Sequence, residues 1–235
     1  MVEKIYDFHS HILPGMDDGC KDVRESVTAL EMSYAQGVRG VCLTPHFYAD
    51  ESIEEFLFRR HMAEESLAMA IKEESGPFPQ LCVGAEVAYY PNMSRTEEIE
   101  KLCLGDSRYL LLELPFGKWG SEVVRDLQGL CTRGITPILA HIDRYWSMQS
   151  REMFRKLLSM DLRVQINGAA LLDWKRRGKA KKWLWDGSAQ YVGSDCHNLT
   201  NRTPNLGNAF QKLPEETAKT LSAQGAQTWK EIAGG

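Results

Sequence analysis

The sequence predicts a single α/β domain, with a barrel of parallel strands as the preferred architecture and an open doubly wound sheet as the alternative. Roughly seven strand-like segments follow one another along the 235 residues, and helical segments separate most of them. These strand-like segments are almost continuously apolar, as in Leu110–Leu112 and Ile138–Ala140, which is typical of strands buried on both faces of a parallel sheet. No linker, repeat or low-complexity stretch divides the chain. Residues 1–235 are therefore expected to form one domain.

The expected elements alternate in chain order. Strands are predicted at Lys4–Phe8, Gly40–Thr44, Leu81–Val87, Tyr109–Leu114, Thr136–Ala140, Leu162–Ile166 and Gln190–Gly193. Helices are predicted at Val23–Gln36, Ile53–Glu74, Glu122–Thr132, Glu152–Ser159 and Lys175–Trp185. Gly37 suits the end of the first helix because glycine readily adopts the left-handed conformation found there.

Composition excludes several classes of protein. The chain is 43% hydrophobic and 26% charged, as expected for a globular domain, and its net charge of −4 is unsuited to general nucleic-acid binding. No apolar run approaches the length of about 18 residues that a membrane span needs. The charged start Met1-Val2-Glu3-Lys4 precedes no secretory segment. The six cysteines form no metal-finger or disulfide pattern, so a cytoplasmic location is expected.

Histidines and carboxylates follow the predicted strands. Of the six histidines, only His61 lies within a helix, among charged neighbours, where a surface role is expected. The other polar residues at or just after strand ends are His9, His11, Asp18, His46, Glu86, Glu113, His141, Asp195 and His197. In a barrel, the residues at the C-terminal ends of the strands gather at one mouth. We therefore expect these nine side chains to meet.

A metal centre explains these residue types better than packing does. His9 and His11 are two residues apart, so in a strand they point the same way and can reach one ion. Glu86 and Glu113 end apolar segments, where an uncompensated carboxylate would be costly to bury. Imidazole and carboxylate ligands suit manganese, iron or zinc. Metal-dependent hydrolysis is the leading hypothesis.

An ordered set of motifs resembles the PHP (polymerase and histidinol phosphatase) superfamily of metal-dependent phosphoesterases. Within it, the bacterial capsule and exopolysaccharide protein-tyrosine phosphatases are the most similar branch. The motifs are Asp7-Phe8-His9-Ser10-His11, Asp17-Asp18-Gly19, Thr44-Pro45-His46, Gly84-Ala85-Glu86, Leu112-Glu113, His141-Ile142-Asp143-Arg144-Tyr145, Gln165-Ile166-Asn167 and Ser194-Asp195-Cys196-His197-Asn198. They extend over nearly the whole chain. The resemblance implies a distorted (β/α)7 barrel of the PHP type.

The resemblance also implies three divalent metal ions, with manganese the first choice. His9, His11 and Asp195 would hold the first ion, and Glu86 would bridge it to the second, which Glu113 and His141 complete. Asp18, His46 and His197 would hold the third ion. Asp17 stays an alternative to Asp18. Because the four carboxylates offset only part of the metal charge, an anionic phosphate monoester is the favoured substrate.

The implied activity is that of a protein-tyrosine phosphatase acting on a membrane-associated bacterial tyrosine kinase of polysaccharide synthesis. A metal-bridged hydroxide would attack phosphorus. Arg144 would stabilise the added charge, and both Arg144 and Arg202 can make bidentate contacts to phosphate oxygens. Phe47 and Tyr48 after His46, and the segment Phe116–Trp119, are candidates for an aromatic wall around the phenyl ring, although packing within loops explains them equally well.

Four alternatives remain. Histidinol phosphate or another small ester is a possible substrate of the same metals, and a metal-bound scaffold without catalysis is the hypothesis from another class. An amidohydrolase is disfavoured because the fourth strand ends in Glu113 and not in a bridging lysine. Cys196 and Arg202 match the C-x5-R-[ST] signature of cysteine phosphatases. The loop between them lacks the glycines that let backbone amides surround a phosphate, so we expect no thiol chemistry.

The segment from Trp174 to Trp185 combines six cations with three tryptophans. An outer helix with a solvated basic face and buried tryptophans is the simplest interpretation. Docking to an anionic membrane surface or to an acidic protein segment is the alternative.

Overall fold

Parallel strands form two sheets in the computed structural model, which describes residues 4–234; residues 1–3 and 235 of the predicted domain lie outside the described residues. The first sheet has the order β1-β2-β4, with bounds Ile5–Ser10, Val38–Leu43 and Gln80–Val83. The second has the order β3-β5-β6-β7-β8-β9, with bounds His46–Phe47, Glu86–Ala88, Tyr109–Glu113, Thr136–Leu139, Arg163–Asn167 and Tyr191–Gly193. Every paired strand is parallel to its neighbour.

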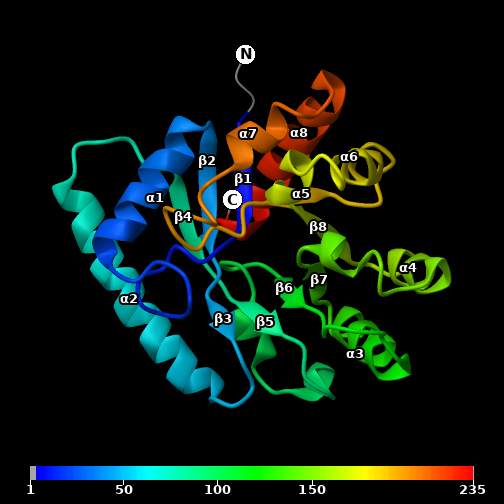
Figure 1. Ribbon diagram of the computed structural model, residues 1–235. Coiled ribbons are helices and arrows are strands. Elements are labelled where there is room, and N and C mark those ends of the chain that lie inside the picture. The colour runs from blue at the N-terminus through cyan, green and yellow to red at the C-terminus, as the bar shows by residue number, and fades with distance from the viewer. Residues whose placement is uncertain (1–3, 235) are drawn as a thin grey trace.

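The two sheets meet at two places and curl around a shared interior (Figure 1). A parallel bridge joins Ser10, at the end of β1, to Cys196, just beyond β9. At the other junction β2 and β4 lead directly into β3 and β5, and the amide of Gly84 donates to the carbonyl of Leu43 at 3.0 Å. The carboxyl ends of strands from both sheets therefore face one region.

The predicted alternation of parallel strands and helices is confirmed, but two of the expected strands are each divided in two. The second expected strand, Gly40–Thr44, is followed by a separate β3, and the third, Leu81–Val87, is split into β4 and β5. Pro45 cannot donate to a ladder. A Cβ on Gly84 would lie 2.6 Å from the Leu104 side chain, so only glycine lets the backbone pass there. The described residues consequently contain nine strands, where the sequence pattern predicts about seven.

The five predicted helices are confirmed and lie outside the strands (Figure 1). They are α1, α2, α3, α4 and α6, with bounds Val23–Ala35, Ile53–Glu73, Ser121–Thr132, Arg151–Leu158 and Arg177–Trp185. Side-chain caps start three of them, from Asp22, Ser52 and Ser150, which satisfies amide groups that the helix itself leaves free. Gly37, with φ 91°, follows α1 as expected. None of the helices among residues 4–234 has the length and apolar character that crossing a membrane requires.

Helix α8, Glu215–Ile232, has no counterpart among the predicted elements. It packs against β1 and covers the amino ends of the strands, where Trp229 donates from Nε1 to Oε1 of Gln80 at 2.9 Å. A Cβ on Gly40 would lie 2.7 Å from the Trp229 ring, so glycine is needed for this contact. The short helices α5, Gly168–Leu172, and α7, Leu206–Phe210, were also not predicted as separate elements.

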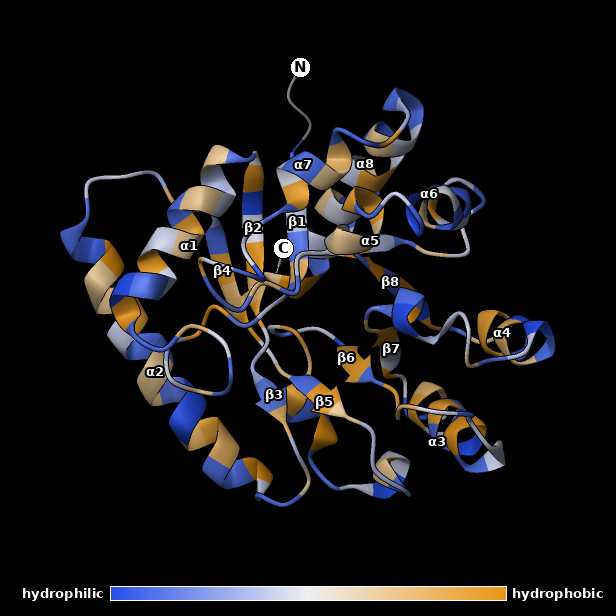
Figure 2. Cartoon of the chain, in the orientation of Figure 1, coloured by the Kyte–Doolittle hydropathy of each residue, from blue (hydrophilic) through white to orange (hydrophobic). Residues whose placement is uncertain are grey.

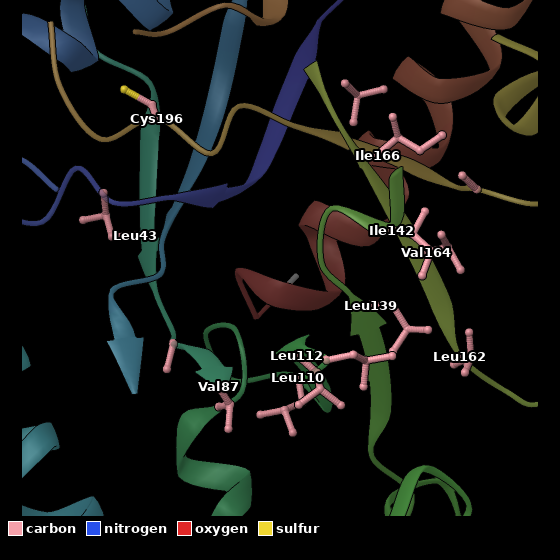
Figure 3. Packing of buried hydrophobic residues seen from close by; sticks show 14 of the residues in the cluster. Leu43, Val87, Leu110, Leu112, Leu139, Ile142, Leu162, Val164, Ile166 and Cys196 are labelled. Atoms are coloured by element: carbon pink, nitrogen blue, oxygen red, sulfur yellow. The ribbon is translucent and has the colours of Figure 1, made fainter. Parts of the chain in front are cut away.

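The hydrophobic core lies between the strands and the outer helices. Strand β6 is mostly hydrophobic in Figure 2, and its Leu110 and Leu112 pack with Leu139 of β7 in Figure 3. Leu111, between them, faces a second cluster with Phe8 and Trp229. Alternate residues of one strand thus fill two apolar layers, which explains the continuous apolar sequence of that strand.

Candidate metal centre

The structure brings the nine predicted ligands together at the carboxyl ends of the strands. Three overlapping groups have ligand atoms within 4.8 Å of one another: His9, His11 and Asp195; His9, Glu86 and His141; and His11, Asp18, His46 and His197. Glu113 ends β6, and its Oε1 lies 3.4 Å from Nε2 of His141. His61 lies apart on the exposed surface of α2, within 3.6 Å of Glu65. The groups overlap, because His9 and His11 each belong to two of them, and His11 is grouped with Asp18, His46 and His197 as well as with His9.

Two buried histidines present their lone pairs to each other. Nδ1 of His11 lies 2.7 Å from the Asp17 carboxylate, and Nδ1 of His9 lies 3.3 Å from Oε1 of Gln165. Both acceptors favour a proton on Nδ1, so Nε2 of each ring faces inward and is the position left for a second proton or a metal ion. Although burial opposes it, the neighbouring carboxylates raise the pKa of both histidines, that of His11 to about 10. The two Nε2 atoms are 3.1 Å apart. Two lone pairs at this distance repel unless a proton or a metal cation lies at the nitrogens, so this donor set fits a positive charge such as a metal ion.

Glu86 is the centre of the cluster. Its Oε2 lies 3.1–3.2 Å from nitrogens of His9, His11 and His46, yet it is a buried oxygen without a hydrogen bond. Its Oε1 lies 2.8 Å from Nε2 of His141. Burial alone would raise the pKa of this carboxyl, but the surrounding imidazoles hold the pKa well below its ordinary value. An ionised, fully buried carboxylate needs positive charge beside it, which protonated imidazoles or bound cations can supply.

Asp17 and Asp18 have different surroundings. Both oxygens of Asp17 are occupied, because Oδ2 accepts from the His46 amide at 2.8 Å as well as contacting His11, and Oδ1 accepts from the Gly19 amide at 2.9 Å. Despite burial, these contacts hold the pKa of Asp17 at about 2. Asp18 instead directs Oδ1 toward Nε2 of His197 and of His46, at 3.3 and 3.8 Å. The geometry favours Asp18 over Asp17 as a ligand.

Two ligand positions have unusual backbone conformations. His141 has φ 31° and Asp195 has φ 53°, so both lie in the left-handed region that non-glycine residues rarely adopt. Residues held in this way concentrate at functional sites. Gly19 is required for a different reason, lack of space, since a Cβ there would lie 2.1 Å from the His11 carbonyl.

Both predicted arginines lie beside the cluster. Arg144 contacts Oδ2 of Asp195 and lies 3.6 Å from Glu113, and Arg202 lies 2.5 Å from Oδ1 of Asp195. They line a polar cavity of about 190 Å³ that opens next to Asp195 and that also includes Arg176. An anion held in this cavity could therefore reach the cluster and two guanidinium groups together.

Strand β8 supplies two polar side chains that the sequence analysis gave no role. Gln165 accepts from the His141 amide at 2.6 Å, in addition to its contact with His9, and Asn167 donates from Nδ2 to Oδ2 of Asp195 at 2.8 Å. The signal was available, because Gln165 and Asn167 are two residues apart in a strand, on either side of the apolar Ile166, and therefore point the same way. Both side chains hydrogen-bond to proposed ligands and so hold them in position: Gln165 contacts His9 and His141, and Asn167 contacts Asp195.

Cys196 is directed away from this chemistry. Its side chain is buried in the hydrophobic core, as Figure 3 shows. Burial raises the pKa of its thiol well above the ordinary value, so the reactive thiolate is scarce near neutral pH. The C-x5-R match of the sequence is therefore not a cysteine-phosphatase site, as expected.

The fold and the cluster together define a class: an α/β protein of parallel strands with a histidine and carboxylate metal centre at their carboxyl ends. The chain belongs to the family described as "Capsular polysaccharide synthesis, CpsB/CapC", whose model matches residues 5–227. This confirms the family resemblance seen in the motifs.

Known relatives cover nearly the full chain. The tyrosine-protein phosphatase CpsB of Streptococcus pneumoniae is 31% identical and aligns over 89% of this chain and 90% of its own. CpsB of Streptococcus agalactiae serotype III is 29% identical over 93% of each chain. A solved structure described as belonging to the metal-dependent tyrosine phosphatases YwqE of Bacillus subtilis and CpsB of S. pneumoniae superposes with a TM-score of 0.76. It covers 97% of this chain and 94% of its own at 21% identity, which supports the fold.

Proposed function

We propose that this protein is a metal-dependent phosphomonoesterase that removes phosphate from phosphotyrosine in proteins. The observation that carries the proposal is the convergence of buried imidazole nitrogens on Oε2 of Glu86, an oxygen without a hydrogen bond, beside two arginines that line one cavity. Its relatives are tyrosine-protein phosphatases by name, and this agrees with the chemistry of the site.

Three divalent ions, with manganese preferred over iron or zinc, are proposed for the cluster. His9, His11 and Asp195 would hold one ion, and Glu86, Glu113 and His141 another. The third would be held by Asp18, His46 and His197. When bound, such ions lower the pKa of water and offset phosphate charge. Asp17 and Gln165 keep the His11 and His9 rings turned so that Nε2 of each is free to bind.

Arg144 and Arg202 are proposed to bind the non-bridging phosphate oxygens. Each guanidinium now contacts Asp195, and that carboxylate would be shared with a cation in the loaded site. The arginines can then turn part of their donors toward phosphate, with two parallel hydrogen bonds each. Charge that develops on the oxygens as phosphorus is attacked is stabilised by the same donors.

Tyr48 is the aromatic residue best placed to contact the phenyl ring of the substrate. It is half exposed and its ring stacks on His46 at a centroid distance of 5.3 Å. Phe116 is 72% exposed but packs near Tyr145. Phe47 and Trp119 are buried and serve the core. A flat apolar ring next to a ligand suits an aryl ester better than an alkyl one.

We further propose that the substrate is a membrane-associated tyrosine kinase of capsule or exopolysaccharide synthesis and that the enzyme works in the cytoplasm. The architecture proposed for the described strands is a distorted (β/α)7 barrel. In it, β2 and β3 count as one barrel strand, and β4 and β5 count as another. The family description, capsular polysaccharide synthesis, supports the pathway.

A substrate panel tests the function. Metal-reconstituted protein is assayed with phosphotyrosine peptide, phosphoserine peptide and histidinol phosphate, beside His9→Ala. Rapid turnover of phosphotyrosine that His9→Ala abolishes is expected. Histidinol phosphate as the far better substrate would identify a small-molecule phosphatase instead, and no turnover of any ester by fully loaded protein would favour a scaffold.

A further inference from the structure

The segment from Trp174 to Trp185 exposes two large aromatic side chains, and every charged residue between them is a lysine or an arginine. Trp174 is 78% exposed and Trp185 is 75% exposed, so neither is a core residue. Only the third tryptophan, Trp183, fits the packed helix expected from the sequence, with its ring 5.2 Å from Phe154 and 5.6 Å from Trp146. A simple outer helix therefore does not account for this segment. We name it the basic strip, defined as Trp174, Lys175, Arg176, Arg177, Lys179, Lys181, Lys182 and Trp185.

Most cations of the basic strip have no acidic partner. Among residues 4–234, Arg176 pairs with Asp143 and Asp173, and Lys182 pairs with Asp186. Lys175 and Lys179 instead lie over indole rings, 5.4 Å from the centre of Trp174 and 4.7 Å from that of Trp146. In a chain whose net charge is −4, such a run of uncompensated cations is a local exception and fits an anionic partner.

The basic strip begins at the cavity beside the metal centre. Arg176 lines that cavity together with Arg144 and Arg202, and its Nη1 lies 3.0 Å from Asp143, the residue before Arg144. From there α6 leads outward, and Lys179 packs on Trp146, two residues beyond Arg144. The strip is thus continuous with the place proposed for the substrate phosphate.

We infer that the basic strip binds acidic residues that flank the phosphotyrosine of the protein substrate, and so selects acidic phosphorylation sites. This inference rests on the proposed phosphatase function. The nine residues of α6 extend over about 13 Å, the length of about four residues of extended chain. Acidic side chains within roughly the first six residues on one side of the phosphotyrosine are expected to matter. Trp174 supplies an apolar surface on which the peptide backbone and aliphatic groups pack.

An extended peptide fits this geometry better than a bilayer does. The cations run away from the cavity along one helix, as a chain leaving the phosphotyrosine would. A membrane pressed on the strip would approach the mouth that a protein substrate must enter. Binding to anionic lipid is nevertheless an outcome that the experiment distinguishes.

The test compares matched substrates and matched variants. The substrates are p-nitrophenyl phosphate and two phosphotyrosine peptides that differ only in Asp/Glu or Asn/Gln at the flanking positions. The variant is Lys175→Glu with Lys179→Glu, two exposed lysines that touch neither phosphate nor metal. The control, Lys212→Glu with Lys230→Glu, changes the charge equally on exposed positions near α7 and on α8.

The natural protein should prefer the acidic peptide by about tenfold in kcat/KM, mainly through KM. Salt near 0.5 M should reduce the difference in kcat/KM between the two peptides, because it screens the charges. The strip variant should lose the preference while p-nitrophenyl phosphate turnover stays unchanged, and the control should keep it. An equal preference in the strip variant, or none in the natural protein, overturns the inference. Loss of binding to phosphatidylglycerol vesicles with unaltered peptide kinetics would assign the strip to a membrane.

Failure of the proposed function gives a different result. If loaded protein hydrolyses none of the three esters, the phosphatase proposal fails. The strip is then still tested by calorimetric binding of the same peptides carrying a phosphonomethyl group in place of the phosphate ester. Tighter binding of the acidic peptide, lost in the strip variant alone, supports the strip, and equal binding of both peptides contradicts it.

Discussion

The two ends of the same strands have opposite characters. In β1, Tyr6 near the amino end lies 5.7 Å from the ring of Trp229 in α8, whereas His9 near the carboxyl end faces Glu86 at 3.2 Å. The amino ends are closed by apolar contacts, and the carboxyl ends gather buried imidazoles and carboxylates. The difference indicates that one end stabilises the fold and the other performs the chemistry. Substitutions at the two ends should therefore separate stability from activity.

The largest effect is expected for His9→Ala at the carboxyl end. His9 belongs to two of the three ligand groups, so its loss should impair two ions. Substitution of a residue that hydrogen-bonds to a metal ligand typically lowers metal affinity or activity by about 10–100-fold. Removal of a direct ligand should therefore lower kcat/KM by more than about 100-fold. Metal content is measured by plasma mass spectrometry beside activity. Full activity at normal metal content would contradict the metal centre.

At the amino end, Trp229→Ala should affect stability instead. The side chain is 5% exposed, and its indole donates to Gln80, so truncation leaves a cavity and an unpaired amide oxygen. The expected loss is about 3–5 kcal/mol in the free energy of unfolding, measured by urea denaturation. Metal content and kcat of the folded fraction should stay close to those of the natural protein. A loss of kcat without a change in the free energy of unfolding would contradict the claim that the amino end serves stability and the carboxyl end serves activity.

Asp17→Asn refines the comparison within the carboxyl end. The carboxylate holds Nδ1 of His11 at 2.7 Å but contacts no proposed ion. The amide has a single acceptor oxygen, so it can keep only one of the two bonds from the His46 and Gly19 amides. Its loss of charge also weakens the hold on the His11 ring. Metal affinity should fall by about 10–100-fold, as measured by competition with a chelator. Loss as severe as in His9→Ala would mean that Asp17 is itself a ligand and that Asp18 is not.

The sequence predicted which side chains gather at the carboxyl ends of the strands because strand ends are marked by a change in residue type. Glu113 after three leucines and His9 with His11 after an apolar segment stand out in this way. The interruptions of strands were harder to predict. A strand is interrupted at Gly84 because the side chain of Leu104, twenty residues later, occupies the space that a side chain at position 84 would need. The closing helix α8 was missed for a similar reason. Its small and polar residues are explained only by the surface that it covers.

Roles that depend on side-chain direction could not be predicted. Asp17 and Asp18 are adjacent and chemically identical, and only their contacts distinguish an orienting group from a candidate ligand. The same holds for Gln165, which contacts the ring of His9 although 156 positions separate the two residues. Local pattern identifies which strands carry polar groups, whereas long-range packing decides what each group touches.

The smallest effect is expected for Cys196→Ser, although this residue lies between two proposed ligands, Asp195 and His197. The thiol is 1% exposed and faces the core. The residues on either side of it are proposed ligands, so adjacent residues here point into the metal centre and into the apolar core. Activity with phosphotyrosine peptide should change by no more than about twofold, because a buried thiol of raised pKa supplies no nucleophile. Arg202→Met is the matched comparison, since the other half of the C-x5-R match contacts Asp195 and should matter. Loss of activity in Cys196→Ser with normal metal content and unaltered melting, together with full activity in Arg202→Met, would reverse both assignments.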